Sequence, residues 1–244
     1  MLYHIGRYVM WHRMIYRPPE KWSMYYKETV RQMHSIGVGS LMIIFVVSFF
    51  IGAVTAVQFI YQLDGTFIPR YYIGYIVRDM SIIELAATFS SIILAGKVGS
   101  NMASEIGGMR QKEHIDAMEI MGVNTASFLV LPKIVAALIV IPLLISVAAI
   151  FSITGGYVAT LYSGSFSSEE FIQGLRSFFE PYNVTMMYIK AVVFAYILTS
   201  IACYQGYFVK GGSIELGQAS TRAVVFGIIV ILIADYIIAV LLTT

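Results

Sequence analysis

Two acids in this sequence are isolated within apolar runs, where a carboxylate is costly. Glu84 interrupts the run SIIELAATF, and Asp235 interrupts IADYIIAV. An ionisable side chain inside a membrane segment faces a cavity, a partner or an interface. For Glu84, and for Gln58 at a comparable depth, a substrate-binding role and an interfacial role are equally open. For Asp235 we predict a helix-packing or dimer contact rather than a proton relay, because we expect no second intramembrane acid at its depth.

A third chemical feature is a short charged stretch, GGMRQKEHIDAMEIMGVN, which lies between two long apolar runs. As one helix over residues 109–121 it is amphipathic, with Ile115, Met118 and Met121 on one face, and it is too short to span a membrane. Such a helix suits docking to a soluble protein. The alternative is a helix that rests on lipid, but an anionic leaflet would repel its acids.

Just before this stretch, small and polar residues recur at helical spacing. The small residues form two rows, Ala95, Gly99, Ala103 and Gly107 beside Gly96, Ser100, Ser104 and Gly108. Rows of small residues let another helix approach closely, so we predict packing here rather than contact with a ligand. Lys97, Asn101 and Glu105 lie four residues apart, and we predict a polar network in which they are one another's partners.

The sequence offers little for catalysis. Within the apolar runs, we expect no nucleophile to lie at the same membrane depth as a base that could activate it. The sequence also contains no GxxxxGK phosphate-binding loop. The single cysteine, Cys203, excludes a disulfide or a thiolate metal cluster within the chain. We therefore predict that the chain is not an enzyme and binds no metal or cofactor itself. Any ATP hydrolysis would take place in a separate partner.

The composition indicates that membrane helices position these side chains. Of the 244 residues, 58% are hydrophobic and 12% are charged, whereas about a quarter of an ordinary soluble domain is charged. The net charge of +2 gives no reason to expect a nucleic-acid partner. We predict an all-α membrane protein. An N-terminal amphipathic interfacial segment over residues 1–36, which contains Pro18 and Pro19 and does not resemble a signal peptide, precedes a transmembrane domain over residues 37–244.

Five spanning helices are predicted. They cover residues 38–61, about 80–102, 126–161, 188–209 and 223–242. Each is long enough, at ~1.5 Å per residue, to cross a hydrocarbon core of ~30 Å. Pro132 and Pro142 predict that the third span is tilted or kinked. Between the third and fourth spans, the pattern SSEE predicts a short helix that ends before Pro181.

The basic residues predict the orientation. With the N-terminus in the cytoplasm, all Lys and Arg except Arg70, Arg78, Arg176 and Lys190 fall on the cytoplasmic side. The positive-inside rule favours this arrangement. The charged stretch between the second and third spans is then cytoplasmic, whereas the short helix after the third span and the C-terminus are periplasmic.

Two long blocks resemble the signature of a known family. They read AGKVGSNMASEIGGMRQKEHIDAMEIMGVN and TSIACYQGYFVKGGSIELGQASTRAVV. They are similar to the MlaE permease family, the membrane subunits of ABC transporters that move lipids together with MCE-domain proteins, and the similarity covers essentially the whole chain. Family members often have Arg-Glu-Leu-Gly-Pro where this chain has IELAA. No headgroup role for that arginine carries over, and we expect the second span to be straighter.

The resemblance implies partners and residue roles. The charged stretch would be a coupling helix that docks into a cytoplasmic ABC ATPase (MlaF-like), which binds ATP and Mg. The implied docking residues are Arg110, Lys112, Glu113, Asp116 and Glu119. Two copies of the chain would form a homodimer around a phospholipid pocket that opens toward a periplasmic MCE-domain protein (MlaD-like). The pocket would be lined by Val54, Val57, Gln58, Tyr61 and Glu84.

The implied location is the bacterial inner membrane, and the implied role is phospholipid transport that maintains outer-membrane lipid asymmetry. Two other functions stay open. A proton-coupled secondary transporter would use Asp235 or Glu84 as a relay and would need no ATPase. A lipid-binding scaffold would bind lipid in the same pocket without any dependence on nucleotide.

Overall fold

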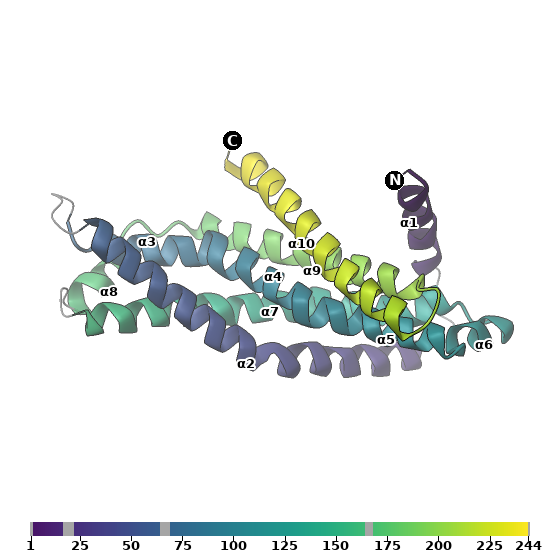
Figure 1. The fold of residues 1–244 in the computed structure, drawn as a ribbon. Coiled ribbons are helices and arrows are strands. Elements are labelled where there is room, and N and C mark those ends of the chain that lie inside the picture. The colour runs from purple at the N-terminus through teal and green to yellow at the C-terminus, as the bar shows by residue number, and fades with distance from the viewer. Residues whose placement is uncertain (1, 17–21, 64–68, 164–167, 244) are drawn as a thin grey trace.

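Five long helices form an elongated bundle (Figure 1). The computed structural model describes residues 2–16, 22–63, 69–163 and 168–243, and every regular element in these ranges is helical. The helices long and apolar enough to span a membrane are Trp22–Leu63, Tyr72–Gln111, Thr125–Tyr162, Pro181–Tyr207 and Ser213–Leu242. The predicted all-α membrane architecture with five spans is therefore confirmed.

The first span is longer than predicted. Helix α2 runs from Trp22 to Leu63, 42 residues in all, which corresponds to about 63 Å, roughly twice the thickness of a hydrocarbon core. Its first turns belong to residues 1–36, the segment that we expected to lie on the membrane surface and apart from the first span. Nothing there breaks a helix, and Glu28 accepts a hydrogen bond from Gln32 at 2.8 Å. The helix therefore passes through the expected boundary at residues 36 and 37 without a break.

The N-terminal segment contributes one separate helix, α1 (Leu2–Ile15). Trp11 and Ile15 are buried against the bundle, and the Tyr8 hydroxyl donates to Ser200 Oγ at 2.7 Å. Burial raises the pKa of Tyr8, so this hydroxyl keeps its proton and remains a donor. Pro18 and Pro19, which we expected to break this segment, lie outside the described residues.

The second span is a composite helix. It consists of α3 (Tyr72–Met80), η1 (Ser81–Phe89), α4 (Ser90–Leu94), η2 (Ala95–Gly99) and α5 (Ser100–Gln111). The two η segments have the wider turns of a π-helix, a geometry that occurs mainly as short insertions near functional sites. The absence of the family's Gly-Pro pair therefore does not leave a uniform α-helix here.

The third span, α7 (Thr125–Tyr162), contains Pro132 and Pro142 and packs closely against α2. Glycines permit this approach. A Cβ atom added to Gly52 would lie 1.8 Å from the Ser152 carbonyl oxygen, and one added to Gly155 would lie 2.0 Å from the Phe49 carbonyl oxygen. Any larger side chain at either position would force the two backbones apart, so these glycines determine the spacing of the helices.

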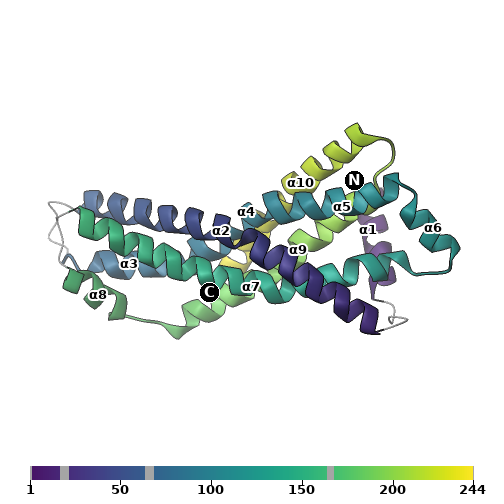
Figure 2. The same cartoon turned by 90° about the horizontal axis from the view of Figure 1, so that it is seen from below.

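The two ends of the bundle carry different short helices. Helices α1 and α6 (His114–Ile120) lie at one end, and α8 (Ser168–Arg176) lies at the other (Figures 1 and 2). The predicted short helix before Pro181 is α8, and Pro181 starts the fourth span, α9 (Pro181–Tyr207). Buried Arg78 donates to the carbonyl oxygens of Leu175 at 2.7 Å and Ser177 at 2.8 Å, which satisfies carbonyls left open at the end of α8.

The fifth span, α10 (Ser213–Thr243), is the least covered by the rest of the chain. Only 11% of its most apolar stretch is buried, compared with 61% for α9. It crosses the bundle at an angle (Figure 1), and near its C-terminal end the Tyr182 hydroxyl of α9 donates to the Leu242 carbonyl oxygen at 3.0 Å. Most of its apolar surface is therefore available to lipid or to another subunit.

Candidate functional site

Three charged side chains meet inside the bundle. Lys190, on α9, is fully buried, and its Nζ lies 2.8 Å from Glu84 Oε1 and 2.7 Å from Asp235 Oδ1. Glu84 belongs to η1 and Asp235 to α10, so the triad of Lys190, Glu84 and Asp235 joins three of the five spans. Two carboxylates share one ammonium, which gives the cluster a formal charge of −1.

The local backbone supports this triad. Lys190 Nζ also donates to the Ile83 carbonyl oxygen at 3.3 Å, within the π-helical stretch. The Thr88 hydroxyl lies 3.3 Å from Glu84 Oε2 and 3.1 Å from Asp235 Oδ2. The hydroxyl carries one proton, so it donates to only one of the two acids at a time, and Lys190 is the donor that both acids share. Buried charges are tolerated only with partners of this kind.

One prediction about these residues is wrong. Asp235 does have a second acid at its depth, because Glu84 meets the same lysine. The burial of Lys190 inside the bundle was not predicted, and its place on the outer side stays a prediction. Depth read along the chain treats each helix as perpendicular to the membrane, whereas α10 slants across the bundle (Figure 1). The available signal was a lysine inside an apolar run, since such a cation needs an acidic partner.

The first row of small residues packs as predicted. Gly99 and Ala103 are buried, and a Cβ atom added to Gly206 of α9 would lie 2.5 Å from the Ala103 carbonyl oxygen. A Cβ atom on Gly107 would lie 2.5 Å from Leu216 Cδ1 of α10. The second row is more open, because nothing lies within 4 Å of a Cβ atom built on Gly96 or Gly108. The first row of the second span packs against α9 and α10, and Ser104 of the second row adds a hydrogen bond to Ser220 of α10 at 2.8 Å.

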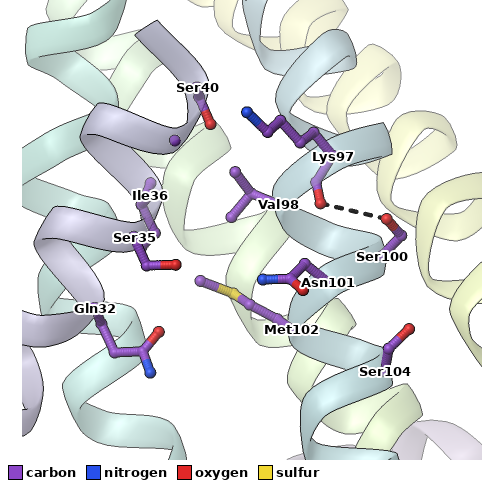
Figure 3. A pocket seen from close by; sticks show the side chains of 11 residues that line it. Gln32, Ser35, Ile36, Ser40, Lys97, Val98, Ser100, Asn101, Met102 and Ser104 are labelled. Carbon is purple, nitrogen blue, oxygen red and sulfur yellow. Dashed lines mark hydrogen bonds between the residues drawn. The ribbon is translucent and has the colours of Figure 1, made fainter.

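The predicted network of Lys97, Asn101 and Glu105 is wrong. Glu105 Oε2 lies 2.6 Å from Nζ of Lys133, a buried lysine of α7. Lys97 and Asn101 are exposed and line a groove that faces α2 (Figure 3). Lys97 lies in the wider turns of η2, where α-helical spacing does not apply. From Asn101 to Glu105 the chain is α-helical, and four residues advance it by about 400°, which rotates Glu105 by a further ~40° toward another neighbour.

The structure brings together four of the five residues that we expected to line the outer pocket. Val54, Val57, Gln58 and Tyr61 lie on one exposed face at the end of α2, with Tyr61 85% exposed. Glu84 instead faces α9 and α10. In the described part of the chain, no hydrogen bond or ion pair joins Gln58 to Glu84. The lining role of these residues stays a prediction that depends on what covers the face of α2.

The charged stretch is not one helix over residues 109–121. Helix α5 ends at Gln111, and α6 begins at His114 after a break at Lys112 and Glu113. Glu113 has a φ of 60°, a left-handed conformation that turns the chain sharply and is uncommon for residues other than glycine. Helix α6 therefore projects from the end of the bundle as a separate unit (Figure 1).

Contacts on its inner side fix α6 to the bundle. Ile115 is fully buried. Arg110 Nη1 lies 3.0 Å from Asp116 Oδ1 and 3.5 Å from Glu119 Oε1. The Tyr207 hydroxyl, at the end of α9, donates to Glu119 Oε1 at 2.9 Å. Three of the predicted docking residues, Arg110, Asp116 and Glu119, are therefore used within the chain.

The outer side of this end carries a different set of residues. Lys112 and Glu113 are exposed, as predicted for docking residues. Ile120 is 88% exposed and Met121 is 71% exposed, so Met121 does not share the buried face of Ile115 as we had predicted. The sequence interpretation missed Ile120, although an isoleucine next to Glu119 in so short a helix has little to pack against. The exposed surface combines charge with two apolar side chains.

Metal binding finds no support in the described residues, where no group of three or more His, Cys, Asp or Glu could hold an ion. Cys203 is buried and free. The polar groups of the spans instead pair with one another or line the groove beside α2. Together, the five spans and the projecting α6 define a multi-pass helical membrane protein.

The chain belongs to the MlaE permease family, whose profile matches residues 29–241. A probable ABC transporter permease protein of Rickettsia bellii is 34% identical over 224 residues, which are 92% of this chain and 85% of that relative. The intermembrane phospholipid transport system permease protein MlaE of Haemophilus influenzae is 32% identical over 210 residues, 85% of this chain and 80% of that protein.

A more distant relative comes from a plant. The chloroplast protein TRIGALACTOSYLDIACYLGLYCEROL 1 of Arabidopsis thaliana is 25% identical over 219 residues, which cover 90% of this chain and 62% of that protein. The similarity therefore extends over nearly all of the helical bundle described above.

Proposed function

We propose that this chain is the membrane subunit of an ABC transporter that moves phospholipids between the inner membrane and a periplasmic MCE-domain protein, and so maintains outer-membrane lipid asymmetry. The observation that carries the proposal is α6, a short charged helix that projects from one end of a bundle of the MlaE family. Its exposed face, with Glu113, Ile120 and Met121, suits the groove of a cytoplasmic ATPase (MlaF-like). ATP and Mg would bind to that partner.

The contacts of α6 support its role in transmitting force. Glu119 is bonded to Tyr207 of α9, and Thr125 of α7 lies 2.7 Å from the same tyrosine hydroxyl. A displacement of α6 would therefore act on two spans at once. Farther along, the close contact of Gly206 with Ala103 links α9 to α5 without flexible side chains between them. Packed helices of this kind move as rigid bodies rather than deform.

A homodimer is part of the proposal. The apolar face of α10 is largely uncovered in one copy, and a second copy packed there would bring two sets of spans together. The exposed face of Val54, Val57, Gln58 and Tyr61 would then line a phospholipid pocket, in which apolar walls accept acyl chains and Gln58 meets a headgroup. A ring of MCE-domain subunits (MlaD-like) would receive the lipid above it.

The proposed location is the bacterial inner membrane, with the N-terminus and α6 in the cytoplasm and the C-terminus in the periplasm. The excess of Lys and Arg in the segments at the α6 end supports this orientation. The end that carries α8 would then face the MCE-domain partner.

Proton-coupled secondary transport is the second candidate, because the triad places two carboxylates on one lysine. A proton on either acid would neutralise the cluster. This mechanism predicts that a pH gradient alone drives lipid movement in vesicles containing only this chain, and that Asp235→Asn abolishes it. Movement that requires the ATPase and ATP, and survives in Asp235→Asn, would eliminate this candidate.

The test of the proposed function is a native pull-down in mild detergent, with mass spectrometry of the proteins and lipids that accompany the chain. We compare the wild type with Glu113→Lys combined with Ile120→Asp. Both side chains are exposed, so the change leaves the internal contacts of α6 in place. We expect an ATPase and phospholipid with the wild type, and loss of the ATPase alone from the variant.

Tyr162→Asp is the matched control, because Tyr162 is also 88% exposed but lies at the α8 end of the bundle. It should retain both the ATPase and the lipid. An ATPase that stays bound to the α6 variant would contradict the docking assignment. Wild-type protein that retains neither ATPase nor phospholipid would overturn the proposed function, whereas lipid alone, with no effect of nucleotide, would favour the scaffold.

A further inference from the structure

A groove of about 560 Å³ separates α2 from η2 and α5. It lies at the α6 half of the bundle, so it shares no residue with the expected outer pocket at the far end of α2. Its walls are Gln32, Ser35, Ile36, Gly39, Ser40, Lys97, Val98, Ser100, Asn101, Met102 and Ser104. Its volume falls within the range of roughly 300–1,000 Å³ that is usual for ligand pockets.

The charge of the groove is one-sided. Lys97 is the only charged residue among those that line it, and no ion pair or hydrogen bond of its side chain occurs within the described residues. Two acids that lie close in sequence to lining residues already have partners, since Glu28 accepts from Gln32 at 2.8 Å and Glu105 pairs with Lys133 at 2.6 Å. The ammonium group therefore faces the groove without a counter-charge, which favours an anion there.

Uncharged polar groups surround this cation. Ser40 lines the groove and is fully buried, yet its hydroxyl has no hydrogen-bond partner among the residues that the structure describes. Figure 3 shows the ammonium end of Lys97 reaching toward the turn of α2 that carries Ser40, and the Asn101 amide pointing toward the same helix. An unsatisfied buried hydroxyl costs about 1–3 kcal/mol. An oxygen-rich ligand bound between these groups would remove that cost.

The surroundings indicate what kind of anion binds. Ile36, Val98 and Met102 give the groove apolar walls. Beside it, α2 exposes Val38 at 62% and Met42 at 78%, as expected for a helix face in contact with acyl chains. A ligand with a phosphate at one end and hydrocarbon at the other matches both features, whereas a free phosphate matches only the first.

We propose that this groove is a second lipid site, in which Lys97, Ser40 and Asn101 hold the phosphate of a phospholipid headgroup on the α6 side of the bundle. The inference rests on the proposed function and extends it. A lipid that passes between the outer pocket and the cytoplasmic leaflet would bind here as an intermediate step. Its phosphate would contact Lys97, and its acyl chains would lie along the exposed face of α2.

The test measures how fast the Lys97 amine is acetylated by a water-soluble succinimidyl ester, using the full-length protein in detergent after a delipidating wash. Peptide mass spectrometry quantifies the modification, with exposed Lys112 as the internal reference. The probes are dihexanoylphosphatidylglycerol, dihexanoylglycerol and inorganic phosphate at equal concentrations. At a lipid concentration ten times its Kd, acetylation of Lys97 should slow about tenfold, because only the unoccupied fraction reacts.

Protection by the phospholipid, with little from either dihexanoylglycerol or phosphate, is the expected result. Equal protection by inorganic phosphate would overturn the lipid assignment and leave a simple anion site. No protection by any probe would overturn the site altogether. Phospholipid that co-purifies with the wild type while Lys97 stays unprotected would refute this inference alone, whereas failure of the proposed function would show as the absence of any retained phospholipid.

Gly39→Leu provides a variant that fills the groove without altering its charge. A Cβ atom at Gly39 meets only Lys97 Nζ, at 4.0 Å, among the described residues, so a side chain can start into the groove there without a backbone clash at Cβ. We expect it to remove the lipid-dependent protection of Lys97. Gly6→Leu, on α1, is the control, since nothing lies within 4 Å of its Cβ position, and it should leave the protection intact. Undiminished protection in Gly39→Leu would contradict the proposed site.

Discussion

Two lysines in the spanning helices of this chain occupy opposite environments. Lys190 is fully buried and has Glu84 and Asp235 within 2.8 Å. Lys97 lies in an open groove whose lining contains no acid. The ammonium group of Lys190 therefore has two carboxylate partners, whereas the ammonium group of Lys97 has none among the residues that line its groove.

The difference separates a structural role from a binding role. A buried cation with two carboxylates ties three helices together, and removing the lysine leaves two unpaired carboxylates, of which Asp235 is only 15% exposed. An exposed cation without a partner adds little to the stability of the fold, but it remains available to a ligand. The comparison therefore predicts that substitutions at the two lysines affect different measurements.

Lys190→Met should have the largest effect on stability. It leaves Glu84 and Asp235 close together and unpaired, so we expect a loss of about 3–5 kcal/mol in the free energy of unfolding. Thermal unfolding of the purified protein in mild detergent measures the change. Adding Glu84→Gln and Asp235→Asn to the same protein should restore much of the loss. Wild-type stability in the single variant would show that the triad does not hold the helices together.

Lys133→Met should have an intermediate effect. The side chain of Lys133 is only 3% exposed, but it has a single partner, Glu105, which is 35% exposed. One carboxylate, partly solvated by water, would remain, whereas loss of Lys190 leaves Glu84 beside Asp235, which is only 15% exposed. We therefore expect a loss of about 2 kcal/mol. The same unfolding measurement applies. A loss larger than that of Lys190→Met would contradict the argument that two shared acids make the triad the stronger contact.

Asp235→Asn should have a smaller effect. It leaves Lys190 paired with Glu84 at 2.8 Å and makes the cluster neutral, while the asparagine can still accept from Thr88. We expect the free energy of unfolding to change by about 1 kcal/mol. A collapse of stability as great as that of Lys190→Met would indicate that Asp235, rather than Glu84, is the essential counter-charge.

Lys97→Gln should have the smallest effect on stability, within about 0.5 kcal/mol of the wild type, because an exposed side chain without a partner is replaced. Its effect should appear in the lipid content of the purified protein, measured by native mass spectrometry. Lys97→Arg, which preserves the charge, should retain more phospholipid than Lys97→Gln. A marked loss of stability in Lys97→Gln would place this lysine in the structural class of Lys190.

Much of this protein follows from its sequence. The long, largely apolar runs determine five spans, because a backbone in hydrocarbon must satisfy its own hydrogen bonds within helices. The row of Gly99 and Ala103 indicates close helix packing, and the charged stretch after it indicates a segment outside the bilayer. Each of these features depends on residues that are near one another in the chain, so their spacing is sufficient to predict them.

The pairing of charges was decided only by the tertiary structure. Lys190 meets Glu84 and Asp235 across three helices whose tilts and depths no spacing rule supplies, and Glu105 turns to Lys133 because the helix rotates it away from Lys97. The left-handed turn at Glu113 likewise separates α6 from α5 although no glycine or proline is present there. Local sequence determines which residues are helical, but the ion-pair partners, the exposed lysine and the groove depend on how the helices pack.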